Sequence, residues 1–221
     1  MLSIILIIST LIISFFSLYI LSKYDFVLIR KNVSVNQIFD LSFISIVIAF
    51  ITGRLFFIIN EARPELLNPI QFFYILRFPG ISMLGFFIGG TICTWFLFRK
   101  TKALRRIYDI FTISFFPVFL FHLTFRPYPM FPMIISAVIF ISGMVFWSFI
   151  IRSHQKYSLK DCSISYLVMA LVSSDALFYS FFSVRRIVVS NLSLIQIVSV
   201  IFLITSIFMF WANQKRLFTK D

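Results

Sequence analysis

Hydrophobic residues in this 221-residue chain are arranged in seven long runs separated by short polar connections. The runs cover residues 2–22, 38–59, 80–98, 107–125, 131–151, 163–182 and 191–211. Each approaches the ~20 apolar residues that an α-helix needs to cross the hydrocarbon core of a bilayer. The alternating pattern of membrane β-barrels is absent, and backbone groups in lipid must be hydrogen-bonded internally. The pattern therefore predicts an all-α, polytopic membrane bundle that forms a single domain over residues 1–221.

Composition supports the bilayer as the solvent. Mean hydropathy is +1.00 and only 13% of the residues are charged, whereas a soluble domain carries about a quarter. The first run has no basic stretch before it, and the first alanine of the chain is Ala49. Because a cleavable signal peptide needs both a basic start and small residues at the cleavage site, we expect this run to stay as a membrane helix.

Basic residues predict the orientation. The first, third and fifth connections and the C-terminal tail hold fourteen Lys and Arg residues, and the other connections hold five. Because basic loops face the cytoplasm, the count predicts an outside N-terminus and a cytoplasmic C-terminus. The net charge of +12 is therefore a topological signal, and we expect no nucleic-acid partner. The longest connection, residues 60–79, contains Pro64, Asn68 and Pro69 among several aromatic residues. It predicts an interfacial segment on the outer leaflet or a re-entrant stretch.

Ionisable residues inside the apolar runs are the candidates for chemistry. A central charge costs ~2.5–3.5 kcal/mol on insertion scales, so it needs a partner or a watery cavity. Arg54 and Asp175 lie in the outer halves of the second and sixth runs, and His122 and Arg126 lie one turn apart near the outer end of the fourth. The spacing of i and i+4 places the last two on one helix face.

Three arginines in the outer connections are expected at the same membrane depth as these residues. They are Arg77, Arg185 and Arg186. One interpretation is a basic cavity in which guanidinium groups hold the phosphate of an anionic phospholipid. The alternative is that Arg54 pairs with Asp175 as a structural bridge while the loop arginines reach ordinary headgroups. His122 is then a helix-end histidine near water. Cys93 and Cys162 are not spaced as a disulfide or metal pair, and we expect no metal and no cofactor.

Several segments resemble one family of bacterial membrane enzymes. The segments are Gly53-Arg54-Leu55, Asn68-Pro69 followed by Phe72, Gly80-Ile81-Ser82-Met83-Leu84-Gly85, Tyr108-Asp109, and Ser193-Leu194-Ile195-Gln196-Ile197-Val198-Ser199. Their order and spacing are similar to those of prolipoprotein diacylglyceryl transferase. That family has a G-R on its second helix, then N/D-P, a G-M-S-F-H-G-G opening its third helix, S-D-F at the start of the next, and a late S-x-G-Q-x-L-S. The resemblance implies seven helices with the N-terminus outside, which agrees with the charge count.

The chain also departs from the family pattern. The family's histidine falls on Leu84, and its following glycine pair is Gly85-Phe86. The family's G-R-x-G-N-F on helix 4 and Y-G-x-x-R…E on helix 6 have no clear match, and the extracytoplasmic head is absent or very short. Gly85 with Gly89 forms a small-xxx-small pair, and close helix packing is its simpler explanation.

The resemblance implies transfer of diacylglyceryl from phosphatidylglycerol to a lipobox cysteine thiol, at the outer leaflet of the bacterial cytoplasmic membrane. Phosphatidylglycerol-like lipid is then the expected partner, with prolipoprotein signal peptides as candidate partners. Arg54, Arg126, Arg185 and Arg186 are candidates for holding the phosphate, together with Arg77. His122 and Asp175 are the candidate bases. Two alternatives stay open: a relative that binds anionic lipid or a signal helix without turnover, and a small transporter or channel.

Overall fold

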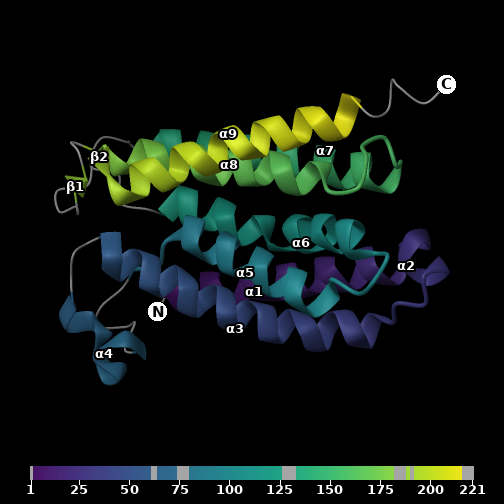
Figure 1. The fold of residues 1–221 in the computed structure, drawn as a ribbon, viewed down its shortest axis with the longest axis horizontal. Helices are drawn as coiled ribbons and strands as arrows, with labels where there is room; N and C mark the ends of the chain where they lie inside the picture. The colour runs from purple at the N-terminus through teal and green to yellow at the C-terminus, as the bar shows by residue number, and fades with distance from the viewer. Residues whose placement is uncertain are drawn as a thin grey trace. The chain divides into compact units, whose positions relative to one another are not determined.

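The computed structural model describes residues 2–60, 64–73, 80–125, 133–181, 188–189 and 192–215, and in this part the chain is almost entirely helical (Figure 1). The helices are α1 (Leu2–Lys23), α2 (Phe26–Arg30), α3 (Val35–Asn60), the 3₁₀ turn η1 (Pro64–Leu67), α4 (Pro69–Phe73), α5 (Met83–Phe98), α6 (Leu104–Phe125), α7 (Met133–Gln155), α8 (Ser163–Ser180) and α9 (Leu194–Lys215). Two strands, β1 (Val188–Val189) and β2 (Leu192–Ser193), form a short antiparallel pair.

Each of the seven predicted segments contains a long helix in its described part, so the prediction of an all-α polytopic bundle is confirmed. Among the described residues, five helices are long and apolar enough to cross a membrane, and two shorter apolar helices correspond to α1 and α5. The long spans are Val35–Asn60, Leu104–Thr124, Val138–Gln155, Ser163–Ser180 and Leu194–Lys215. The chain is thus a multi-pass membrane protein. Its orientation stays a prediction.

Helix starts differ from the predicted ones where polar residues cap the first turn. We expected a helix from residue 38, but α3 begins at Val35 because Ser34 and Gln37 form a capping box. The Ser34 amide donates to Gln37 Oε1 at 3.1 Å, and the Gln37 amide donates to Ser34 Oγ at 3.2 Å. Such reciprocal bonds satisfy N–H groups that a helix start leaves unpaired. The first connection also contains the short helix α2, which the sequence pattern did not predict.

The chain divides into two compact units, with boundaries inside α3, α8 and α9. Unit 1 comprises residues 1–39, 100–168 and 213–221, and unit 2 comprises residues 40–99 and 169–212. The single-domain prediction concerns the whole chain and is not tested by this division.

Unit 1 is built around α6, which packs against both α1 and α7. Many apolar side chains of α6 are fully buried, among them Ile107, Ile110 and Ile113. Two further contacts connect α7 to α6. The Trp147 indole N–H donates to the Ile113 carbonyl at 2.9 Å, and the absence of a side chain at Gly143 leaves room for Leu120. Pro117 lies inside α6, and the helix continues through it.

In unit 2, the contact between α3 and α5 depends on glycines. A Cβ at Gly85 would lie 2.6 Å from Phe56 Cβ, and one at Gly89 would overlap the Thr52 side chain. The backbones therefore approach closely enough for Thr52 Oγ1 to donate to the Gly85 carbonyl at 3.0 Å. This is the packing role expected for the small-xxx-small pair.

The connection between α3 and α5 has one buried side. In its described part, residues 64–73, Leu66 and Phe72 are buried and pack with Ile58 of α3. Leu67, Ile70 and Phe73 are exposed on the same short helical turns. The segment thus presents an apolar face away from α3, which fits the predicted interfacial segment.

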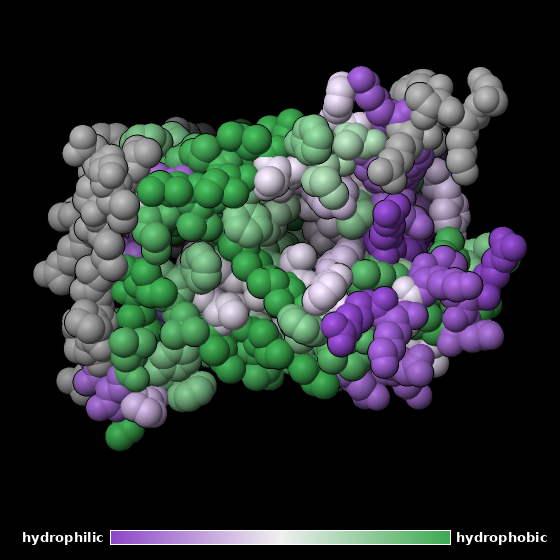
Figure 2. Space-filling view, in the orientation of Figure 1, coloured by the Kyte–Doolittle hydropathy of each residue, from purple (hydrophilic) through white to green (hydrophobic). Residues whose placement is uncertain are grey.

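Hydrophobic side chains cover much of the visible helix surface, and hydrophilic ones gather over α2 and the loop between α7 and α8 (Figure 2). Exposed apolar side chains occur on the other long spans but not on α6, whose described apolar side chains are buried or half-buried; examples are Phe43, Val145 and Ile201. Such exposure is costly in water and neutral in hydrocarbon. The surface is therefore suited to lipid.

Candidate functional site

Arg54 is the most unusual side chain of unit 2, because it is a fully buried cation. Its exposed fraction is 0%. Nε donates to the carbonyl of Phe72 at 3.2 Å, and Nη1 donates to the carbonyl of Gly80 at 2.7 Å. The guanidinium Cζ also lies 5.4 Å from the centre of the Phe57 ring. The guanidinium is therefore fixed between α4 and the residues that precede α5.

One side of the guanidinium group of Arg54 has no partner. Nη2 is buried and donates to no hydrogen-bond acceptor among the described residues. No carboxylate in the described part of the chain forms an ion pair with Arg54. In the described part of the chain, Arg54 is held by backbone carbonyls rather than by the bridge to Asp175 that was one of the two interpretations. A buried charge without a counter-charge is unfavourable by several kcal/mol, so the part of this site that the structure describes is suited to an anion.

The glycines and serine around Arg54 shape the backbone that it binds. Gly80 has φ +149°, and a Cβ there would overlap the Phe57 ring. The Ser82 amide donates to the Gly53 carbonyl at 3.0 Å, and Ser82 Oγ caps α5 by accepting from the Gly85 amide at 3.4 Å. The motif positions before and after Arg54 thus bring α3 and the start of α5 together.

Leu84 is the residue at which the motif resemblance places the family's histidine. Its side chain is 0% exposed and belongs to the core. Leucine can neither accept a proton nor hydrogen-bond a substrate. If the chain performs acid–base chemistry, another residue must supply it.

Asp109 has an architectural role in unit 1. It is buried on α6, and its carboxylate accepts three hydrogen bonds at the start of α8. Cys162 N–H donates to Oδ2 at 2.6 Å, while the amide and the hydroxyl of Ser165 both donate to Oδ1 at 2.9 Å. Free N–H groups at a helix start favour a negative charge. Asp109 therefore caps α8 from another helix. Burial raises the pKa of the neighbouring Cys162 thiol to about 12, so this thiol is protonated.

Gln196 also has a local explanation. Ser193 N–H donates to Gln196 Oε1 at 2.7 Å, and the Gln196 amide donates to Ser193 Oγ at 3.3 Å. This is a capping box at the start of α9. The Ser-x-x-Gln spacing in the sequence is sufficient to predict it, although the resemblance alone directed attention to these residues.

The remaining candidates are in different parts of the chain. His122 is half-buried near the end of α6 in unit 1, and Asp175 is half-buried on α8 in unit 2. Arg77, Arg126, Arg185 and Arg186 lie outside the described residues. The structure thus places Arg54, Gly53, Gly80, Ser82 and Gly85 at one site.

A second buried polar cluster, in unit 1, was not predicted. Arg106 Nε donates to Asp25 Oδ2 at 2.7 Å, Nη1 lies 3.4 Å from Asp161 Oδ1, and Nη2 donates to the His154 carbonyl at 3.1 Å. His154 Nε2 is 3.5 Å from Asp25 Oδ2, and the Arg106 guanidinium lies over the Tyr157 ring. Asp25 Oδ1 also caps α2. The cluster joins the residue before α2, the start of α6, the end of α7 and the connection from α7 to α8, which are far apart in sequence.

The fold and site together define a multi-pass helical membrane protein with a buried arginine that is suited to an anionic ligand. The sequence model of the prolipoprotein diacylglyceryl transferase family matches residues 3–126. Because the match covers more than half of the chain, the protein belongs to this family. The matched range includes Arg54, Leu84 and Asp109 but not Gln196. No curated protein and no solved structure matches the chain.

Proposed function

We propose that the chain transfers diacylglyceryl from phosphatidylglycerol to a lipobox cysteine thiol, at the outer leaflet of the bacterial cytoplasmic membrane, with Arg54 binding the lipid phosphate. The observation that carries this proposal is the buried guanidinium of Arg54, with Nη2 unpartnered and no carboxylate bound among the described residues. Family membership supplies the reaction class.

The position of Arg54 supports phosphate binding rather than a purely structural role. Two of its nitrogens are occupied by carbonyls that hold the guanidinium plane in place. A fixed guanidinium binds a phosphate oxygen with little loss of side-chain entropy, and such charge-assisted bonds are about twice as strong as neutral ones. Because Arg54 is fully buried, a phosphate reaches Nη2 only after a neighbouring group moves aside.

The reaction sets clear requirements for the residues. The cysteine sulfur forms a bond with the glyceryl carbon while the bond from this carbon to the phosphate oxygen breaks. Glycerol phosphate leaves with the bonding electron pair, and the thiol proton passes to a base. A cation at the phosphate stabilises the leaving group as charge develops there. His122 and Asp175 are the candidate bases, because Leu84 has no titratable group, and the arginines at 77, 126, 185 and 186 are candidates for further positive charge.

A second function is favoured by one observation. Leu84 replaces the family's histidine and is fully buried, so the position that should carry acid–base chemistry is part of the apolar core. A protein of this kind would hold anionic lipid, or a lipoprotein signal helix, without turnover.

Transfer of labelled diacylglyceryl to a lipobox peptide distinguishes the two functions. The purified protein in nanodiscs that contain phosphatidylglycerol is compared with an active member of the family. Transfer above background that is lost in Arg54→Ala supports the enzyme. Absence of transfer in the presence of phosphatidylglycerol binding overturns the enzyme and supports the lipid-binding relative. Unchanged lipid binding in Arg54→Ala contradicts both.

Two variants separate phosphate binding from backbone support at Arg54. Arg54→Lys keeps the charge but cannot bind two carbonyls and a phosphate together, so we expect partial lipid binding. Ser82→Ala removes the α5 cap, at a cost of about 1 kcal/mol, without changing any charge. If Ser82→Ala lowers lipid binding as strongly as Arg54→Ala, the effect of Arg54 is structural.

A further inference from the structure

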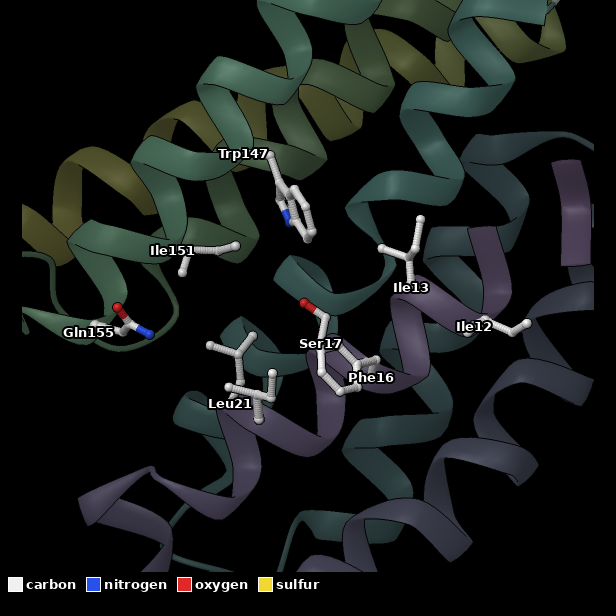
Figure 3. Close-up of a pocket in the computed structure, with 9 residues that line it drawn as sticks. Ile12, Ile13, Phe16, Ser17, Leu21, Trp147, Ile151 and Gln155 are labelled. Carbon is white, nitrogen blue, oxygen red and sulfur yellow. The ribbon is translucent and has the colours of Figure 1, made fainter. Parts of the chain in front are cut away.

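Unit 1 contains an apolar groove between α1 and α7 (Figure 3). Its volume is about 300 Å³. Ile13, Phe16, Ile20 and Leu21 are among the residues that line it from α1, and Trp147 and Ile151 line it from α7. The two helices are not pressed against each other along the groove because both pack on α6. Ile12 and Phe16 remain 63% and 64% exposed.

The walls of the groove are suited to hydrocarbon. The indole N–H of Trp147 is already used by the Ile113 carbonyl, so the ring offers only apolar surface to the groove. Trp147 and Ile151 point from α7 towards α1 (Figure 3). Ser17 is a small wall residue, and Gln155 is the polar residue at one end. None of the lining residues carries a charge.

The length of the groove is similar to the hydrocarbon thickness of one leaflet. From Trp147 to Gln155 the α7 wall is about 12 Å long at 1.5 Å per residue. One leaflet contributes about 15 Å of hydrocarbon, half of the ~30 Å core. An extended acyl chain therefore fits along the groove, whereas a compact ligand would leave part of it empty.

The Gln155 end of the groove is basic. On α1, Lys23 follows Ile20 by three residues, and on α7, Arg152 precedes Gln155 by three. Residues three apart are neighbours on a helix surface. Lys23 and Arg152 are exposed, and the Lys23 ammonium lies beside the Tyr19 hydroxyl at 3.0 Å. One cation from each wall thus flanks the end at which a headgroup would sit.

We propose that this groove binds an anionic glycerophospholipid, with one acyl chain between α1 and α7 and the phosphate beside Lys23 and Arg152. According to the predicted orientation, this lipid belongs to the cytoplasmic leaflet. It is therefore a different lipid from the one proposed at Arg54, and its binding does not depend on transfer activity.

Quenching of Trp147 fluorescence by brominated lipids tests the proposal. Trp147 is kept as the single tryptophan by Trp95→Phe and Trp211→Phe, and the protein is placed in phosphatidylcholine vesicles. A small fraction of phosphatidylglycerol or phosphatidylcholine carries bromine on one acyl chain. We expect brominated phosphatidylglycerol to reach half-maximal quenching at a roughly tenfold lower fraction, because two basic residues contribute to its binding. Lys23→Gln with Arg152→Gln should abolish this preference.

Two controls exclude ordinary boundary lipid and misfolding. A variant that keeps only Trp211, which is exposed on α9 in the same span as Lys215, reports lipids around the protein. Ser17→Phe fills the groove and should reduce quenching of Trp147 by either lipid, whereas Arg54→Ala should leave it unchanged. An equal headgroup preference at Trp211, or a preference at Trp147 that survives loss of both cations, overturns the proposal.

Discussion

Removing the carboxylate of Asp109 should loosen the start of α8. Asp109 lies on α6, is 1% exposed and accepts hydrogen bonds from Cys162 N–H, Ser165 N–H and the Ser165 hydroxyl. Asp109→Ala leaves the two backbone N–H groups without an acceptor, while the hydroxyl can turn elsewhere. An unsatisfied buried donor costs ~1–3 kcal/mol, so we expect a loss of about 2–6 kcal/mol. This is a large part of the ~5–15 kcal/mol by which folded proteins are stable.

Asp109→Asn should have a smaller effect. The amide oxygen can still accept from Ser165, but the NH₂ group then faces the Cys162 N–H, which loses its partner. One unsatisfied donor corresponds to about 1–3 kcal/mol. At ~2–4 °C per kcal/mol for a chain of this size, the unfolding temperature should fall by about 6 °C in Asp109→Asn and about 12 °C in Asp109→Ala.

Thermal unfolding of the detergent-purified protein measures this loss, with Asp40→Asn as the matched control because Asp40 is exposed. Maleimide labelling then tests where the structure opens. Cys162 and Cys93 are both buried free thiols, and only Cys162 is at the start of α8. Faster labelling of Cys162 with unchanged labelling of Cys93 indicates local opening. An unchanged unfolding temperature together with unchanged labelling would refute the capping role.

Three further changes test other parts of the structure. Burial acts to raise the pKa of Asp25, but hydrogen bonds from His154 and Arg106 lower this pKa below its ordinary value. The ionised Asp25 carboxylate therefore stabilises the fold fully above pH ~4, and this stabilisation is lost as pH falls through the lowered pKa. Acid unfolding of Asp25→Asn should therefore lack this step. Gly89→Ala overlaps Thr52 and should cost ~1–3 kcal/mol in thermal unfolding, whereas Gly90→Ala, whose Cβ meets the nearest atom at 3.6 Å, should cost little. Ser193→Ala should cost about 1 kcal/mol and speed amide exchange in the first turn of α9.

The helices could be predicted from the sequence because membrane spans depend on long apolar runs, which are a local property. Helix starts were predicted less well where a polar residue sets the boundary, as at Ser34 and Gln37. The Asp25–Arg106 pair could not be predicted, because 81 residues separate its members and nothing local indicates which loop charges meet. Arg54 was identified as a candidate because a charged side chain inside an apolar segment has a high free energy of insertion into lipid. Its partners were not identified, because they are backbone carbonyls, which any residue type can supply.

The fold tolerates leucine at position 84, where the motif resemblance places the family's histidine. Gly85 faces Thr52 and Phe56 of α3, while the neighbouring Leu84 side chain points into the core. Successive residues of a helix point about 100° apart, so the contact between α3 and α5 that holds the Arg54 site does not depend on the side chain at position 84. Replacement of the family's histidine by leucine therefore leaves the helix contact intact.

The burial of position 84 predicts that Leu84→His alone will not raise the rate of diacylglyceryl transfer. The imidazole would be buried in an apolar position, and an unpaired polar group there costs about 1–3 kcal/mol. We expect a lower unfolding temperature and no increase in diacylglyceryl transfer in the labelled-lipid assay, with Leu84→Met as a control of similar volume. An increase in transfer on Leu84→His that is absent in Leu84→Met would contradict this reasoning. It would show that the side chain at position 84 limits the transfer rate and that the core there accepts a hydrated or paired imidazole.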